Sequence, residues 1–173
     1  PRPHIDGTQI TLLWLQKLKP HECRYEFRFY LPELERLVEA LQIPDPFKTS
    51  SRYVFSAIEA LCLLLARFRS AGNIYDLTKD FGRGATAIAE LINELVIYLD
   101  DIWKHLLDYD DEGILAPEAL QQYADAIRGA GAPLDSVWGF IDCTIRNIAR
   151  PSHWQRAAYN GYKKYHALKY QAV

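Results

Sequence analysis

Several features that are common in secreted and membrane proteins are missing from this sequence. No stretch approaches the ~20 uninterrupted apolar residues that a transmembrane helix needs, and no cleavable signal pattern stands at the start. The three cysteines, Cys23, Cys62 and Cys143, are odd in number and far apart, so they form neither a disulfide framework nor a metal-ligand pair. These absences predict an intracellular protein of a reducing compartment that makes no contact with a membrane.

Methionine is also absent, and the chain begins with Pro1-Arg2-Pro3. We therefore expect an internal or processed piece of a longer polypeptide, with a short natural protein as the weaker explanation. The 173 residues, 49% of them hydrophobic, suffice for one globular unit, or two small ones, with a real core.

Acidic residues are missing from the last part of the chain. Residues 1–142 contain all 22 acids and 14 of the 20 Lys and Arg, a net charge of −8, whereas residues 143–173 contain six bases and no acid. Such an asymmetry indicates a polyanionic partner for the basic part. A solvated surface strip is the structural alternative.

Helical periodicity prevails up to residue 107. Pro32 suits the first turn of a helix, Ser50 or Ser51 is expected to cap a long helix, and Asn73 is expected to cap a short one. Helices are predicted over residues 31–41, 51–68, 73–80, 86–107 and 116–128.

After Pro133 the character of the sequence changes. Residues 137–142 and 165–173 are rich in apolar, aromatic and branched side chains and are predicted to be strands, with Asn160-Gly161 as a tight turn between them. The predicted fold class is a mainly α, helix–turn–helix-like N-terminal region followed by the first strands of an α/β domain. We assign residues 1–132 to the helical domain and residues 133–173 to the start of an incomplete sheet domain, because two or three strands do not form an independently stable sheet.

Residues 73–95 have the layout of a helix–turn–helix, with a short helix, a turn at Gly82 and a longer helix. If the second helix read a DNA major groove, its exposed face would carry bases, yet Arg83 is the one base near its start. The face instead carries Glu90, Glu94, Asp100 and Asp101, which repel phosphates. We expect this helix to serve packing rather than groove reading.

One carboxylate interrupts an apolar run near the end of the chain, Trp138-Gly139-Phe140-Ile141-Asp142-Cys143. A lone Asp in such a run is either a turn-former at a strand end or an acid held in place for chemistry. The strand pattern alone leaves both readings open.

The run "WGFIDCTIRNIARP", followed by "QRAAYNGYKKYHALKYQAV", resembles the start of the catalytic domain of the PIF/Harbinger transposases and the Harbinger transposase-derived nucleases. The resemblance covers residues 138–173 specifically and residues 31–107 more loosely. Members of this family commonly have Gly where this chain has Cys143. The resemblance implies a ribonuclease-H-like fold with a triad of acids, in which Asp142 is the first acid, at the end of the first strand, and residues 165–173 form the neighbouring second strand.

The chemistry implied by the resemblance is metal-dependent hydrolysis or strand transfer at DNA phosphodiester bonds. It requires two Mg²⁺ or Mn²⁺ ions about 3.5–4 Å apart, and both ions prefer carboxylate ligands. Asp142 is thus the expected catalytic and metal-binding residue. The residues expected to hold the DNA backbone are Arg146, Arg150, Arg156, Lys163, Lys164, His166 and Lys169.

No Asp or Glu follows Asp142, so the second and third acids of the triad are missing from these residues. Either the nuclease is truncated, or another chain supplies the rest, or the site has been lost. The alternative function is a domesticated, non-catalytic adaptor whose helical region binds a protein partner. The resemblance implies that this partner is a Myb-like DNA-binding protein. We expect a nuclear location, with import together with that partner, or else a cytoplasmic one. A homodimer stays open, as does a stand-alone helix–turn–helix DNA binder.

Overall fold

The computed structural model describes residues 7–70, 73–108 and 110–172. The chain divides into two compact units, Pro1–Leu107 and Asp108–Val173. From the sequence we expected the change of character at Pro133, whereas the compact units divide directly after Leu107. The two units are described separately below.

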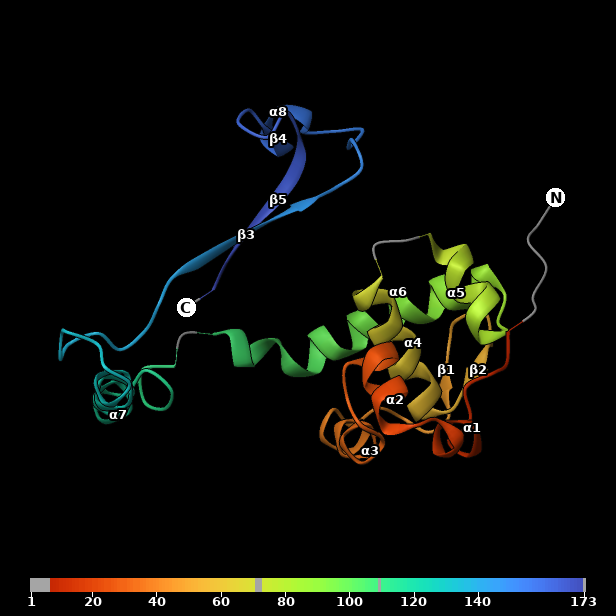
Figure 1. Cartoon of the computed structure of the whole chain (residues 1–173). Coiled ribbons are helices and arrows are strands. Elements are labelled where there is room, and N and C mark those ends of the chain that lie inside the picture. Colours follow the sequence, from red (N-terminus) through yellow and green to blue (C-terminus); the bar gives the residue numbers. More distant parts are fainter. Residues whose placement is uncertain (1–6, 71–72, 109, 173) are drawn as a thin grey trace. The chain divides into compact units, whose positions relative to one another are not determined.

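Unit 1 consists of helices and one short hairpin (Figure 1). Its elements are α1 (Leu12–Lys17), α2 (Pro20–Phe27), α3 (Leu31–Ala40), β1 (Phe47–Lys48), β2 (Val54–Phe55), α4 (Ala57–Arg69), α5 (Ile74–Phe81), α6 (Ala85–Trp103) and the 3₁₀ helix η1 (Lys104–Leu107). The helix predicted over residues 31–41 is confirmed as α3, with Pro32 in its first turn. The predicted cap of α5 is also confirmed, because the Asn73 side chain accepts a hydrogen bond from Tyr75 N.

The predicted cap of the long helix is wrong. Helix α4 begins after Ser56, whose hydroxyl accepts a hydrogen bond from Glu59 N, and not after Ser50 or Ser51. The residues in between pair as strands, with Phe47 opposite Phe55 and Lys48 opposite Val54. Branched and aromatic side chains favour this extended backbone over an added helical turn.

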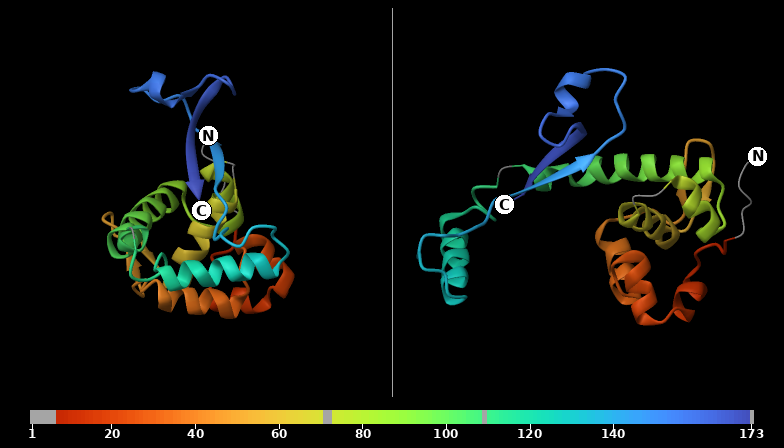
Figure 2. Two further views of the ribbon diagram at one scale, coloured as in Figure 1. Left: turned by 90° about the vertical axis from the view of Figure 1, so that its left-hand side faces the viewer. Right: turned by 45° about the horizontal axis from the view of Figure 1, so that its top comes forward.

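The core of unit 1 forms around α4, which packs against α2, α3, α5 and α6. In both views of Figure 2, α1–α3 (red to orange) lie on one side of α4, and α5 and α6 lie on the other. This central position explains the burial of a helix face much wider than an amphipathic stripe. The α4 residues involved are Ala57, Glu59, Ala60, Leu61, Cys62, Leu63, Leu64 and Ala66. Burial also raises the pKa of the Cys23 and Cys62 thiols, so both behave as inert core residues.

Unit 2 combines α7 (Pro117–Gly129), β3 (Asp142–Asn147), a short α8 (Gln155–Ala158), β4 (Tyr159–Asn160) and β5 (Tyr165–Ala172). The strands form one antiparallel sheet in the order β3-β5-β4. The second predicted strand is confirmed as β5, which pairs with β3 and β4. A turn is present at the predicted place, where Lys164 N donates to Asn160 O at 2.8 Å, but it joins β4 to β5 rather than the two predicted strands.

The first predicted strand is displaced. Residues 137–141 are not paired, and β3 begins at Asp142 instead of ending there. Asp142 stands opposite Ala172, the last described residue of β5. Residues 137–141 have no partner strand among the described residues.

The described residues thus form a mainly α protein with two small antiparallel sheets. Within them, no helix is both long enough and apolar enough to span a membrane.

Candidate nucleic-acid interface

Asp142 occupies the first position of β3, and its side chain is exposed. One carboxylate oxygen, Oδ1, accepts a hydrogen bond from Cys143 N at 2.7 Å. This short-range bond fixes the side chain against its own backbone, as a turn-forming Asp does. The carboxylate remains open to solvent, so an external ligand can reach it.

The basic residues predicted to hold DNA are not gathered around Asp142. Asp142 stands opposite Ala172, whereas Tyr159 of β4 stands opposite His166, six residues further back along β5. At about 3.3 Å per residue, roughly 20 Å separates these two ends of the sheet. Arg150, Arg156, Lys163 and Lys164 belong to the loop, the short helix and the turn around the β4 end (Figure 1).

The register also sorts the side chains between the two faces of the sheet. Directly opposed residues in an antiparallel pair point to the same face, and successive residues alternate. Arg146 and His166 therefore share the face of Asp142, whereas Lys169, which stands opposite Ile145, lies on the other face. His166 also packs edge-on against the Tyr159 ring, with ring centroids 5.4 Å apart.

None of the six bases of residues 143–173 forms an ion pair within the part of the chain that the structure describes. Arg150 donates two hydrogen bonds to Gln155 Oε1, at 2.7 and 3.0 Å, which closes the loop before α8. Lys163 places its ammonium 5.1 Å from the centre of the Tyr162 ring. The positive charge of this segment is therefore left available for an anionic ligand.

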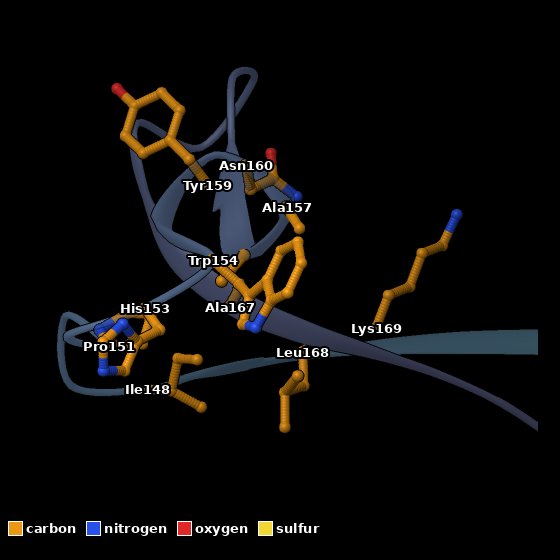
Figure 3. A pocket seen from close by; sticks show the side chains of 11 residues that line it. Ile148, Pro151, His153, Trp154, Ala157, Tyr159, Asn160, Ala167, Leu168 and Lys169 are labelled. Atoms are coloured by element: carbon orange, nitrogen blue, oxygen red, sulfur yellow. The ribbon is translucent and has the colours of Figure 1, made fainter.

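An open hollow of about 570 Å³ lies at the α8 end of the sheet (Figure 3). Trp154, 85% exposed, lies among the lining side chains, near Ala157, while Lys169 extends away from it. Trp154 was not among the residues predicted from the sequence. The sequence feature that could have pointed to Trp154 is that it is the one tryptophan in residues 143–173, a segment rich in basic residues, with no apolar periodicity around it that requires a core aromatic.

The described residues do not by themselves fit the pair of metal ions that the resemblance implies. They contain no group of three or more His, Cys, Asp or Glu side chains that could hold a metal ion. Asp142 would supply a single carboxylate, whereas two-metal centres are bridged and flanked by several. No reaction step through a metal follows from these residues alone.

The helix–turn–helix layout of α5 and α6 is present, but Arg83, the base near the start of the second helix, serves the fold. Arg83 donates from Nε and Nη2 to the two carboxylate oxygens of buried Glu59, both at 2.7 Å. The guanidinium also lies 4.6 Å from the centre of the Phe55 ring. This bidentate pair fastens the α5–α6 turn to α4, so Arg83 is not available for a DNA phosphate or base.

Two of the acids on α6 also serve the fold. Glu94 accepts hydrogen bonds from Ser50 N at 3.1 Å and from Ser50 Oγ at 2.6 Å, and Glu90 accepts one from Ser51 N at 2.7 Å. These bonds hold the tip of the β1–β2 hairpin against α6. The Ser51 N–H bond also lowers the pKa of the Glu90 carboxyl below its usual value.

Comparison with known proteins identifies no relative: no family model, no curated protein and no solved structure matches the chain. The class that the structure defines is a helical unit joined to a small antiparallel sheet. The most distinctive features of this sheet are an exposed carboxylate at one end and, at the other, a group of lysine and arginine side chains that form no ion pair among the described residues.

Proposed function

We propose that the chain is part of a DNA-processing protein similar to the PIF/Harbinger transposases and their derived nucleases, with residues 133–173 opening a ribonuclease-H-like domain. The observation that carries the proposal is the exposed Asp142 carboxylate on β3, which pairs antiparallel with β5. The lysine and arginine side chains that follow it in the sequence supply the attraction for DNA phosphates.

In this proposal the residues of the chain have two tasks. Asp142 is one ligand of the divalent cations, Mg²⁺ or Mn²⁺, that would polarise a phosphodiester when bound. Arg156, Lys163 and Lys164 hold the DNA backbone at the other end of the sheet. A duplex rises about 3.4 Å per base pair, so DNA lying along the sheet would span the ~20 Å between these ends with about six base pairs. The remaining carboxylates must come from polypeptide outside these 173 residues.

A salt titration of DNA binding tests the second task. If about four bases neutralise phosphates, log affinity falls against log salt concentration with a slope of about −3 to −4. Replacing Arg156, Lys163 and Lys164 with Ala should reduce that slope by about 2.7.

The matched control removes three exposed bases from unit 1, Lys17, Lys48 and Lys79, and should leave the slope unchanged. A slope near zero in the unmodified chain, or equal loss in both triple variants, contradicts the assignment of the basic segment.

The role of Asp142 requires a different measurement. In a polypeptide that also carries the second and third acids, Asp142→Asn should abolish Mg²⁺-dependent DNA cleavage while leaving DNA affinity within about threefold, because one neutralised acid alters phosphate binding little. The neighbouring exposed Thr144→Val is the control. Unchanged cleavage by the Asn variant rejects Asp142 as a metal ligand.

A second function, an adaptor that binds a Myb-like protein through the helical unit, is favoured by one apolar surface. A hollow over α4, α6 and η1 is lined by Phe68, 70% exposed, Leu106, 64% exposed, and Trp103, with Asp100 and Lys104 at its polar side. Exposed apolar groups that gather in this way are typical of protein contact sites.

Calorimetric titration with the DNA-binding domain of such a partner tests this alternative. Phe68→Glu should weaken binding by tenfold or more, about 1.4 kcal/mol. Leu13→Glu, an equally exposed site on α1, should not. Equal affinities for the two variants and the unmodified chain reject the apolar hollow as the contact.

A further inference from the structure

We propose that the hollow around Trp154 binds an unpaired nucleotide of DNA. The nucleobase stacks on the indole ring, and the adjoining phosphates are held by lysine and arginine side chains of unit 2. The inference rests on the proposed function, because it names the kind of DNA that the basic end of the sheet takes. It assigns to this end of the sheet a subsite distinct from the Asp142 carboxylate.

The exposure of Trp154 is the first observation. Trp154 is 85% exposed, about twice as exposed as Trp138, the other exposed tryptophan among the described residues. An indole of this size is seldom left so open to solvent. Ala167 of β5 lies next to the ring, and small Ala157 of α8 leaves room beside it (Figure 3). An accessible indole beside small apolar side chains suits a flat ligand that stacks.

The backbone at this position is the second observation. Trp154 has φ 57° and ψ 30°, a left-handed conformation that a bulky residue rarely adopts. Glycine or asparagine would adopt it at less cost. Among the described residues, an aromatic side chain held in this disfavoured conformation and left exposed contributes little to packing, which favours a role in binding.

Charge identifies the ligand. Lys169 is part of the lining, Arg150 and Arg156 lie within four residues of Trp154 in sequence, and residues 143–173 contain no acid. A largely apolar hollow with one lysine in its lining, in a segment with six Lys and Arg side chains and no acid, matches a nucleobase attached to a phosphate backbone.

The stack requires a base that has left the helix. In a duplex both faces of each base are covered by its neighbours, so the indole can stack on a single-stranded, terminal or flipped-out base and not on a paired internal one. We therefore expect the Trp154 subsite to raise the affinity for single strands and for duplexes with an extrahelical base, and to leave the affinity for fully paired DNA unchanged.

Fluorescence anisotropy with the full chain tests this expectation. The probes are a thymidine oligomer of about 15 nucleotides, within the usual range of single-strand site sizes, and a blunt duplex of the same length with hairpin-closed ends. Trp154→Ala should weaken binding of the single strand by about 5- to 150-fold, the effect of losing one base–aromatic stack. It should change duplex binding less than twofold, and Trp154→Phe should restore most of the single-strand affinity.

Two controls keep the result specific. Trp138→Ala removes another exposed tryptophan of unit 2 that does not line the hollow, and it should leave both affinities unchanged. Thermal unfolding of Trp154→Ala should match that of the unmodified chain, because an 85% exposed ring leaves no cavity when removed. A fluorescent adenine analogue within the single strand should be quenched by the unmodified chain and not by the Ala variant.

The outcomes separate this inference from the function on which it rests. Salt-dependent binding of both probes with equal affinities for Trp154→Ala and the unmodified chain overturns the stacking subsite and leaves phosphate binding intact. Absence of salt-dependent binding to either probe overturns both. Equal weakening of single strand and duplex by Trp154→Ala also overturns the inference, because it would indicate a general backbone contact.

Discussion

Removing either half of the ion pair between Glu59 and Arg83 is expected to destabilise the helical unit by about 3 kcal/mol or more. Glu59 lies on the central helix α4 with its side chain 4% exposed, and Arg83 lies in the α5–α6 turn with its side chain 23% exposed. Two 2.7 Å bonds join the guanidinium to both carboxylate oxygens, and a third, at 3.3 Å, joins it to Val54 O. The pair thus connects α4, β2 and the turn.

The magnitude follows from the charge that is left behind. Breaking a buried pair by removing one partner costs about 3–5 kcal/mol, because the other charge stays buried without compensation. Glu59→Ala leaves a guanidinium that water reaches in part and that still bonds Val54 O, so we expect about 3 kcal/mol. Arg83→Ala leaves the more deeply buried carboxylate and removes the cation over the Phe55 ring, so we expect the upper end, about 4–5 kcal/mol.

Urea unfolding followed by circular dichroism measures these losses. A loss of about 3 kcal/mol in a unit of this size lowers Tm by about 10–20 °C. Replacing both residues with Leu should recover most of the stability, since an apolar pair of similar volume avoids the desolvation penalty. Single variants within about 1 kcal/mol of the unmodified chain, or a double variant as unstable as the sum of the two, refute the reasoning.

The same double variant tests the use of Arg83 by the helix–turn–helix segment. Because Arg83 is fully engaged by Glu59, the folded Glu59→Leu/Arg83→Leu chain should bind DNA within about twofold of the unmodified chain, with the same salt slope. A slope less negative by about 0.9 would show that Arg83 contacts a phosphate.

Two further predictions concern unit 1. The lowered pKa of Glu90 means that its carboxylate contributes stability above the usual value near 4.5, and this contribution is lost as pH falls through the lower folded value. Glu90→Gln should therefore destabilise the chain at neutral pH, and urea titrations at successively lower pH below 4.5 should show the difference shrinking. Gly82→Ala should lower the free energy of unfolding by more than about 1 kcal/mol, because Gly82 has φ 60° and an added Cβ would meet the Gly7 carbonyl. The control is Gly129→Ala in α7 of unit 2, where an added Cβ has open space; thermal unfolding should show it to be neutral or stabilising.

The features predicted correctly from the sequence are those that local chemistry determines. Asn73 caps α5 through a bond to a residue two positions away, and Pro32 starts α3 because its ring suits a first turn. The strand β5 is likewise marked by its own side chains. Each of these signals is complete within a few residues.

The errors concern features that distant residues decide. Ser50 and Ser51 have the side chains of helix caps, but their N–H groups bond to Glu94 and Glu90 on α6, so they form a hairpin tip. Residues 137–141 have the composition of a strand, yet a strand also needs a partner, and among the described residues pairing begins at Asp142.

The sequence was enough to predict which residues belong to the candidate site, but not how far apart they lie in space. Asp142 and the bases lie close together in sequence, but the sheet register and the insertion of α8 place most of the bases about 20 Å from the acid. The exposure of Trp154 also depends on the tertiary arrangement, since an identical local sequence could bury the ring.

The distribution of charge decides where a polyanion can bind. Unit 1 carries 14 acids and 13 bases, a net charge of −1, and one of its bases, Arg83, is consumed by Glu59. Residues 108–142 carry eight acids and one base, a net charge of −7, and residues 143–173 carry +6. Fields of opposite sign within one small unit cancel beyond the Debye length of about 10 Å at 0.1 M salt. Long-range steering of DNA to this chain is therefore weak, and binding depends on short-range contacts with the basic segment. Neutralising acids of residues 108–142 should accordingly raise the association rate while leaving the dissociation rate nearly unchanged.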